Sequence, residues 1–213
     1  MNDSNYKFSI ILDLILSYSV PFLELYTADC KKPEEYGEAT LFEICVYLLL
    51  RLDLLLVQFK QQLEIRKKLI LFIADNLVDK FSKVLKNDNL HKIISQRMDI
   101  YGRVVRNSQS EITPQKSLEV FLEGLHFHLI NNIEFSRNTN ELKFWDSGLE
   151  PLILVGIDEM ILQKTHLTFV ETHLVLSFVC CLKHLFQDNN DFTQLSLSEI
   201  EERIKDGVAE AKK

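Results

Sequence analysis

Apolar residues recur every three or four positions along most of the chain, and short polar segments separate these stretches. This spacing places the apolar side chains on one face of a helix, whereas a strand would need strict alternation. The pattern predicts seven helices, at about residues 5–26, 38–61, 63–86, 90–107, 114–135, 151–187 and 196–207. We expect a kink near Pro21 in the first helix and a break near residues 163–168 in the long sixth one.

Three of the predicted helices differ in how their apolar residues are distributed. Helix 38–61 is apolar around most of its circumference, which predicts a central position. Helix 196–207 is short and charged, with a capping box formed by Ser198 and Glu201, and we expect it to pack loosely or fray. Helix 63–86 is amphipathic, and its apolar stripe, which we expect to be buried, consists of Leu63, Ile70, Ile73, Leu77, Phe81 and Val84.

The elements and the composition together predict the fold class. Six glycines and four prolines are too few for a many-stranded β fold, and 46% hydrophobic residues suffice for a substantial core. We therefore expect an all-α, single-domain bundle of six to seven helices with a long apolar C-terminal helix. The bundle would cover residues 1–195, and a short charged helix and tail would cover residues 196–213. Because alanine is scarce, we expect widely spaced helices.

The cysteines and the longest apolar segments bear on the cellular compartment. None of the four cysteines forms a C-x-x-C pair, and three lie in apolar helical stretches, so we expect reduced, buried thiols and a cytoplasmic location. Segment 41–59 approaches the length of a membrane span but contains Glu43, Arg51 and Asp53. Central charges cost roughly 2.5–3.5 kcal/mol each on insertion. We therefore predict no membrane segment.

Two charged residues stand at positions where their helices are otherwise apolar. Arg97 projects into the apolar face of helix 90–107, and Asp53 lies among apolar residues of helix 38–61. A buried guanidinium needs a carboxylate or several carbonyl groups as partners. The pattern predicts a buried Asp53–Arg97 ion pair that fixes the register of two helices. Alternatively, Arg97 faces a cavity and binds an anion.

A second set of polar residues combines carboxylates with imidazoles. Glu159, His166 and His173 lie on one line of the helix at 151–187, and the helix at 114–135 contributes Glu119, Glu123 and His126. Divalent metals and acid–base sites both use such groups, and a Glu-x-x-His pair occurs in di-iron bundles. A single Glu-x-x-His pair also arises by chance, so histidines that form ordinary hydrogen bonds at an edge are the simpler interpretation.

Positive charge is concentrated in one part of the chain. Residues 60–106 contain eleven Lys or Arg against five Asp or Glu, a net charge of +6, whereas the whole chain has −7. This asymmetry suggests a surface for nucleic acid or an acidic partner, formed by Lys83, Lys92, Arg103 and Arg106. Complementary surfaces that bring copies of the chain together would explain it equally well, and a solvated charged face is the most common explanation.

The sequence contains no glycine-rich phosphate loop, no Gly-x-Ser-x-Gly elbow and no His-Glu-x-x-His motif. We therefore expect a non-enzymatic interaction protein that self-associates or binds a protein partner and needs no obligatory cofactor. The alternatives are a helical-bundle enzyme whose Glu/His cluster binds a divalent metal or acts as acid and base, and a protein that binds nucleic acid.

Overall fold

The computed structural model describes residues 3–27, 33–108, 167–187 and 191–212. These residues form helices and no strand, so the predicted all-α fold is confirmed for them. The predicted helix at 114–135 and the first part of the helix at 151–187 lie outside the described residues. The elements are the α-helices α1 (Asp3–Thr27), α2 (Pro33–Gln58), α3 (Leu63–Leu85), α4 (Leu90–Ser108), α7 (Leu167–Phe186) and α8 (Leu197–Ala211), and the short 3-10 helix η2 (Phe192–Gln194).

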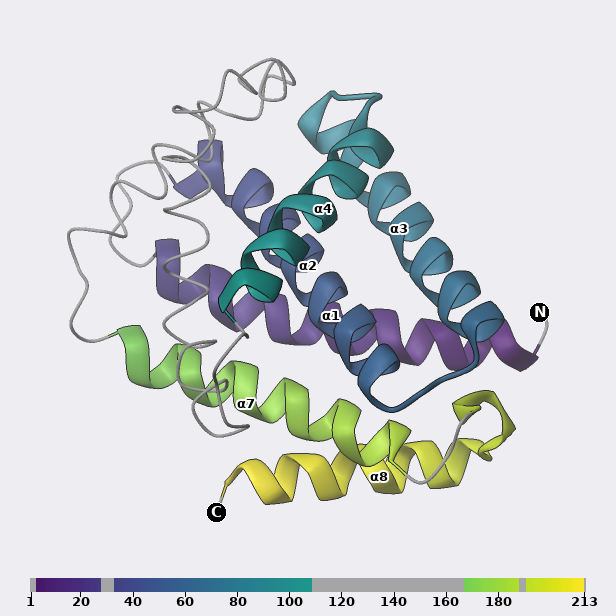
Figure 1. Ribbon diagram of the computed structural model, residues 1–213. Coiled ribbons are helices and arrows are strands. Elements are labelled where there is room, and N and C mark those ends of the chain that lie inside the picture. The colour runs from purple at the N-terminus through teal and green to yellow at the C-terminus, as the bar shows by residue number, and fades with distance from the viewer. Residues whose placement is uncertain (1–2, 28–32, 109–166, 188–190, 213) are drawn as a thin grey trace.

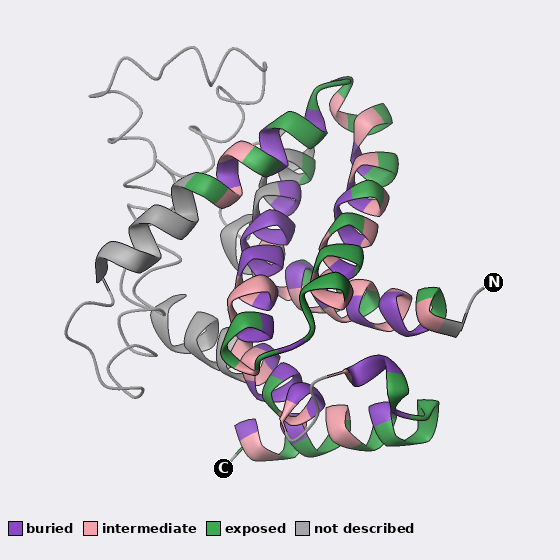
Figure 2. Ribbon diagram, turned by 45° about the vertical axis from the view of Figure 1, so that its right-hand side comes forward, coloured by how far each residue is buried: buried purple, intermediate pink, exposed green. Residues whose placement is uncertain are grey.

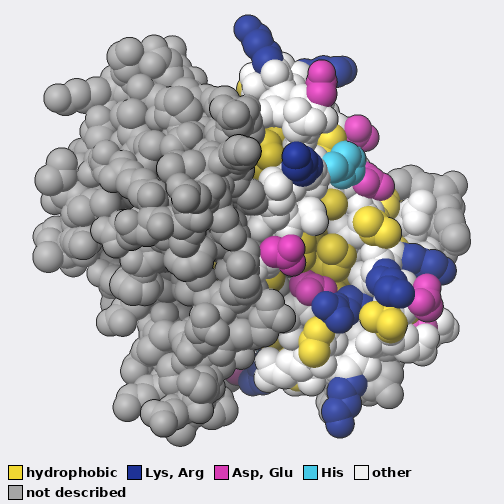
Figure 3. Space-filling view, turned by 45° about the horizontal axis from the view of Figure 1, so that its top comes forward, with side chains coloured by type: hydrophobic (Ala, Val, Ile, Leu, Met, Phe, Trp, Pro, Cys, Tyr) yellow, Lys and Arg dark blue, Asp and Glu magenta, His cyan; other side chains and the backbone are white. Residues whose placement is uncertain are grey.

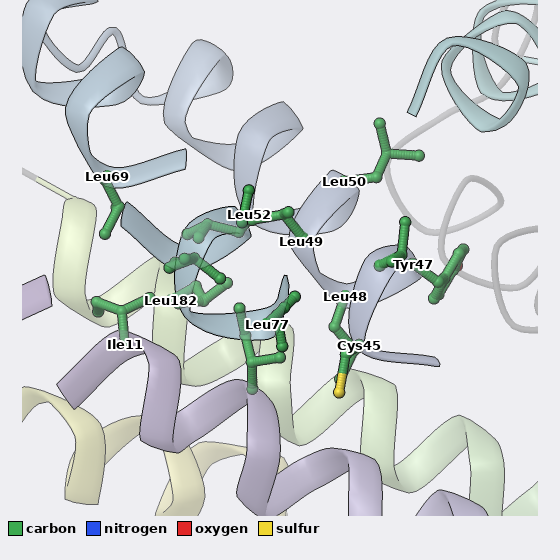
Figure 4. Close-up of a cluster of buried hydrophobic side chains, with 14 of the residues drawn as sticks. Ile11, Cys45, Tyr47, Leu48, Leu49, Leu50, Leu52, Leu69, Leu77 and Leu182 are labelled. Carbon is green, nitrogen blue, oxygen red and sulfur yellow. The ribbon is translucent and has the colours of Figure 1, made fainter. Parts of the chain in front are cut away.

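Helix α2 is the centre of the bundle, as its apolar circumference predicts. It contacts α1, α3, α4 and α7, and every residue from Ile44 to Leu50 is buried. Figure 2 shows its middle turns buried on all sides, whereas α3 and α8 alternate between buried and exposed residues. In Figure 4 the α2 side chains meet Ile11 of α1, Leu77 of α3 and Leu182 of α7.

The ends of α2 and α3 explain how the chain turns between helices. Helix α2 begins at Pro33 and not near residue 38, because proline suits the first turn of a helix. It ends with Lys60 in the left-handed conformation (φ 53°) and with amide-to-carbonyl bonds from Lys60 to Val57 and from Gln61 to Leu56. This Schellman motif reverses the chain within four residues, so α3 returns along α2.

The buried face of α3 differs in part from the predicted stripe. Ile73, Leu77 and Phe81 are buried as expected. Leu63 and Val84 are 55% and 54% exposed, because they lie in the terminal turns of the helix. Leu69 and Ala74, which lie beside the predicted stripe, complete the buried face.

Helix α8 packs closely against α7, so the predicted loose packing is wrong (Figure 1). Gly207 lies against the backbone of Cys180 and Cys181, where an added Cβ would stand 2.5 Å from the Cα atom of Cys181. This pair of helices is therefore tightly spaced, in contrast to the wide spacing expected from the scarcity of alanine. Arg203 of α8 also donates to the carbonyl groups of His184 and Gln187 at the C-terminal end of α7.

The capping box of α8 is formed by Ser196 and Glu199, two residues before the predicted pair. The Glu199 amide donates to the Ser196 hydroxyl (3.3 Å), and the Ser196 amide donates to the Glu199 carboxylate (2.7 Å). With Ser196 as cap, Leu195 and Ile200 occupy the two positions of a hydrophobic staple, and both are buried. Burial of this apolar pair explains why the earlier of the two Ser-x-x-Glu sequences caps the helix.

Within the described residues, no helix is both long enough and apolar enough to cross a membrane.

We predict that Gly207→Ala destabilises the protein by about 1–3 kcal/mol, because the new methyl group forces α7 and α8 apart. Helix propensity alone predicts the opposite sign, a gain of about 1 kcal/mol. Urea unfolding followed by circular dichroism measures the difference. Asp206→Ala, at the exposed neighbouring position, serves as control and should change stability by less than about 0.5 kcal/mol. A stabilising Gly207→Ala substitution would contradict the close contact.

Candidate functional site

Most of the predicted Glu/His cluster cannot be placed. His173 lies in α7, but its side chain is not described, and the other members lie outside the described residues: Glu119, Glu123, His126, Glu159 and His166. In the part of the chain that the structure describes, no three His, Cys, Asp or Glu side chains are grouped closely enough to hold a metal ion. The metal or acid–base site therefore stays a prediction.

The C-terminal half of α7, beyond His173, forms structural contacts. Ser177 and Tyr18 of α1 share a hydrogen bond of 2.5 Å between their hydroxyl groups. Further along α7, His184 and Lys183 both bond to the carboxylate of Glu210 in α8. The hydrogen bond from Lys183, followed by that from His184, lowers the pKa of Glu210. These contacts join the C-terminal half of α7 to α1 and α8.

The predicted partner of Asp53 was wrong. Both carboxylate oxygens of Asp53 accept hydrogen bonds from Arg66 of α3, at 2.6 Å from Nε and 2.7 Å from Nη2. The pair is partly buried, with side chains 16% and 31% exposed for Asp53 and Arg66. The hydrogen bond to Asp53 raises the pKa of Arg66. Because α2 and α3 are antiparallel neighbours across a short turn, Arg66 reaches Asp53 and the pair fixes their register.

Arg97 lies inside the protein, as its position on the apolar face predicts. It is 1% exposed and follows Leu90, Ile93 and Ile94 on the buried side of α4. The burial of the guanidinium is thus confirmed, whereas the ion pair with Asp53 is not formed. Anion binding at Arg97 stays a prediction.

A buried polar cluster that the sequence pattern missed ties both ends of the chain together. Lys7 of α1, 5% exposed, donates through Nζ to the carbonyl group of Thr193 (2.6 Å). Gln61, 7% exposed, accepts from the amide of Phe192 (3.2 Å) and donates to the carbonyl group of Phe186 (3.4 Å). These side chains satisfy backbone groups in the connection from α7 to α8. Their role is therefore structural.

Three of the cysteines lie in the core with protonated thiols, as the sequence suggests. Cys45, Cys180 and Cys181 are buried and free of disulfide bonds. Burial raises the pKa of Cys45 to about 12, against a smaller lowering by its hydrogen bond with Ser19. Burial also raises the pKa of Cys180 and of Cys181. The raised pKa keeps these thiols protonated at neutral pH, so none of the three is activated as a nucleophile.

A groove of about 390 Å³ runs between the first turns of α1 and the middle of α3. Its floor is aromatic, because the rings of Phe8 and Phe72 meet edge to face with centroids 5.7 Å apart. Leu71 lines the groove and is 62% exposed. Lys68 and Asp75, both exposed, lie one turn before and one turn after Leu71. The remaining lining residues are Ser4, Asn5 and Ile65. We call this the α1–α3 groove.

The predicted basic surface is only partly described. Lys83 and Lys92 are exposed, and Arg103 and Arg106 lie in α4 without described side chains. Figure 3 shows acidic side chains and a histidine among the basic ones on this face, with hydrophobic side chains between them. His91 and Asp75, for example, approach to 3.7 Å. Nucleic-acid binding stays a prediction, and the described part of the face has mixed charge.

No known protein family matches this chain, and comparisons with curated proteins and with solved structures also gave no match. Among the described features, the α1–α3 groove is a concave surface lined by a largely exposed apolar side chain, that of Leu71.

We predict that Cys45 resists alkylation in the folded protein. A pKa of about 12 leaves roughly one thiol in ten thousand ionised at pH 8, and the side chain is 0% exposed. Iodoacetamide followed by peptide mass spectrometry should label Cys45 at least about 100-fold more slowly than in urea-unfolded chain. Equal rates in the two states would show that the α1–α2 contact opens freely.

Proposed function

We propose that the chain is a non-enzymatic helical interaction protein that binds a protein partner through the α1–α3 groove. The observation that supports this most directly is the exposure of Leu71, the most exposed large hydrophobic side chain among the described residues. Contiguous apolar surface rimmed by polar groups marks sites of protein association.

The groove has the arrangement of a small protein interface. Leu71 and the partly buried Phe72 supply apolar contact area, and burying a leucine contributes roughly 1.5–3 kcal/mol. Lys68, Asp75 and Asn5 form a polar rim. An apolar centre with a polar rim is typical of interfaces in which a few residues supply most of the binding energy.

We also propose a cytoplasmic location. The described cysteines, Cys45, Cys180 and Cys181, are buried free thiols. Proteins of oxidising compartments commonly use cysteines as disulfides, whereas free buried thiols are usual in reducing ones.

A photo-crosslinking residue at the groove tests the proposed interaction. We expect the substitution Leu71→p-benzoylphenylalanine to give a discrete adduct with a protein in the producing cells, because position 71 would lie inside the interface. Mass spectrometry of the adduct then identifies the partner as a second copy or as another protein. Binding of that purified partner should be at least about tenfold weaker with Leu71→Asp, which corresponds to 1.4 kcal/mol.

The same crosslinker at the exposed Glu202 of α8 is the matched control. Because Leu71 is largely exposed, Leu71→Asp should leave the urea midpoint nearly unchanged. If no adduct forms at position 71, or if the adducts are the same as those at position 202, binding through the groove is refuted.

A further inference from the structure

We infer that the partner in the α1–α3 groove is a second copy of this chain, docked with its α3 antiparallel to the first. This inference rests on the proposed function, because it names the occupant of the same surface. It follows from the order of charges around Leu71 along the outer face of α3.

Lys68, Leu71 and Asp75 lie on one side of α3. They follow each other at spacings of three and four residues, and all three are exposed and line the groove. Residues at these spacings are neighbours on a helix surface. The outer face of α3 thus presents an apolar residue with a positive charge one turn before it and a negative charge one turn after it.

This order of charges is complementary to itself under a two-fold axis. When two identical helices meet antiparallel, an interface is isologous, so each residue contacts its counterpart or one placed symmetrically about the axis. An axis that passes beside Leu71 brings the two Leu71 side chains together and sets Lys68 of each copy against Asp75 of the other. A parallel arrangement would instead set Lys68 against Lys68 and Asp75 against Asp75.

The neighbouring charges restrict the contact to the central turns of α3. Two turns from the axis, Glu64 would meet Asp79 of the other copy, which is unfavourable. If the two α3 helices cross at about 50°, they have moved apart at two turns from the axis, so Glu64 and Asp79 do not come close to each other. Within each copy, the Nζ atom of Lys67 also lies 3.6 Å from the Oε1 atom of Glu64 and partly neutralises the negative charge of that carboxylate.

Asp75 remains accessible to the second copy. Its partner within the chain, His91, approaches only to 3.7 Å, and the two side chains are 63% and 59% exposed. Such exposed pairs contribute little to stability. Lys68 of the other copy therefore meets a carboxylate that is largely open to solvent. Because the contact is restricted to the central turns of α3, we expect a weak, concentration-dependent dimer.

Charge reversal at these two positions tests the inference on the full chain by sedimentation velocity. The wild-type protein should shift from monomer to dimer over roughly 1 to 200 μM. Lys68→Asp alone and Asp75→Lys alone should each weaken dimerisation at least tenfold, because two attractive pairs become repulsive. The double variant Lys68→Asp/Asp75→Lys should dimerise again.

Heterodimer formation in a mixture of the two single variants is the most discriminating test. Lys68→Asp supplies a chain with two negative charges and Asp75→Lys one with two positive charges, so an equimolar mixture should form heterodimers at least as well as the wild-type forms homodimers. Lys83→Asp, an equal charge reversal at an exposed position outside the groove, should leave dimerisation unchanged. Unchanged urea midpoints would show that all variants fold.

A wild-type chain that stays monomeric over the whole range, or single variants that do not associate when mixed, would overturn the inference. The crosslink at position 71 separates this failure from failure of the proposed function. An adduct with a different protein, from a chain that is monomeric, would refute self-association and leave partner binding through the groove intact. If the chain stays monomeric and no adduct forms at position 71, self-association and partner binding through the groove are both refuted.

Discussion

Helix α2 cannot meet water on any side of its middle turns without exposing large apolar side chains. Every residue from Ile44 to Leu50 is buried, and two helical turns of burial require neighbours all around the axis. Four helices supply them, and α8 adds a second layer by packing on α7. The other features depend on this arrangement: the α2–α3 turn, the Asp53–Arg66 pair that fixes its register, and the position of α3 with one face left open.

The fold class and the helix positions could be read from the sequence because they depend on local periodicity. The bounds of α3 and α4 differ from expectation by a single residue. The start of α2 and the cap of α8 could not be read so well. Pro33 lies in a polar segment that resembles a loop, and Ser-x-x-Glu occurs twice at the start of α8, where only burial of Leu195 and Ile200 distinguishes the two registers.

The candidate site was missed for a related reason. A search for polar residues on apolar faces identifies Arg97, which is indeed buried. Leu71 is the reverse case, an apolar residue on a polar face, and the same helical projection contains that signal. Ion-pair partners are harder, because projection around one axis does not say which helices are neighbours. For Asp53, the short connection between α2 and α3 indicates the partner. Only four residues separate the two helices, so they are adjacent and Arg66 lies within reach of Asp53.

The bond from Lys7 to Thr193 has a consequence for how the protein is made. Its two residues are 186 positions apart, and ribosomes add about 5–20 residues per second, so roughly 10 to 40 s separate their synthesis. During that time the first turns of α1 lack both the carbonyl group that binds Lys7 and the ring of Phe192 that packs on Phe8. Although α1 precedes the other described helices in the sequence, its packing is completed only after η2 has been synthesised. Helix α1 can pack against α2 and α3 as soon as these are made, whereas the contacts of Lys7 and Phe8 with η2 wait until nearly all of the described chain has been synthesised.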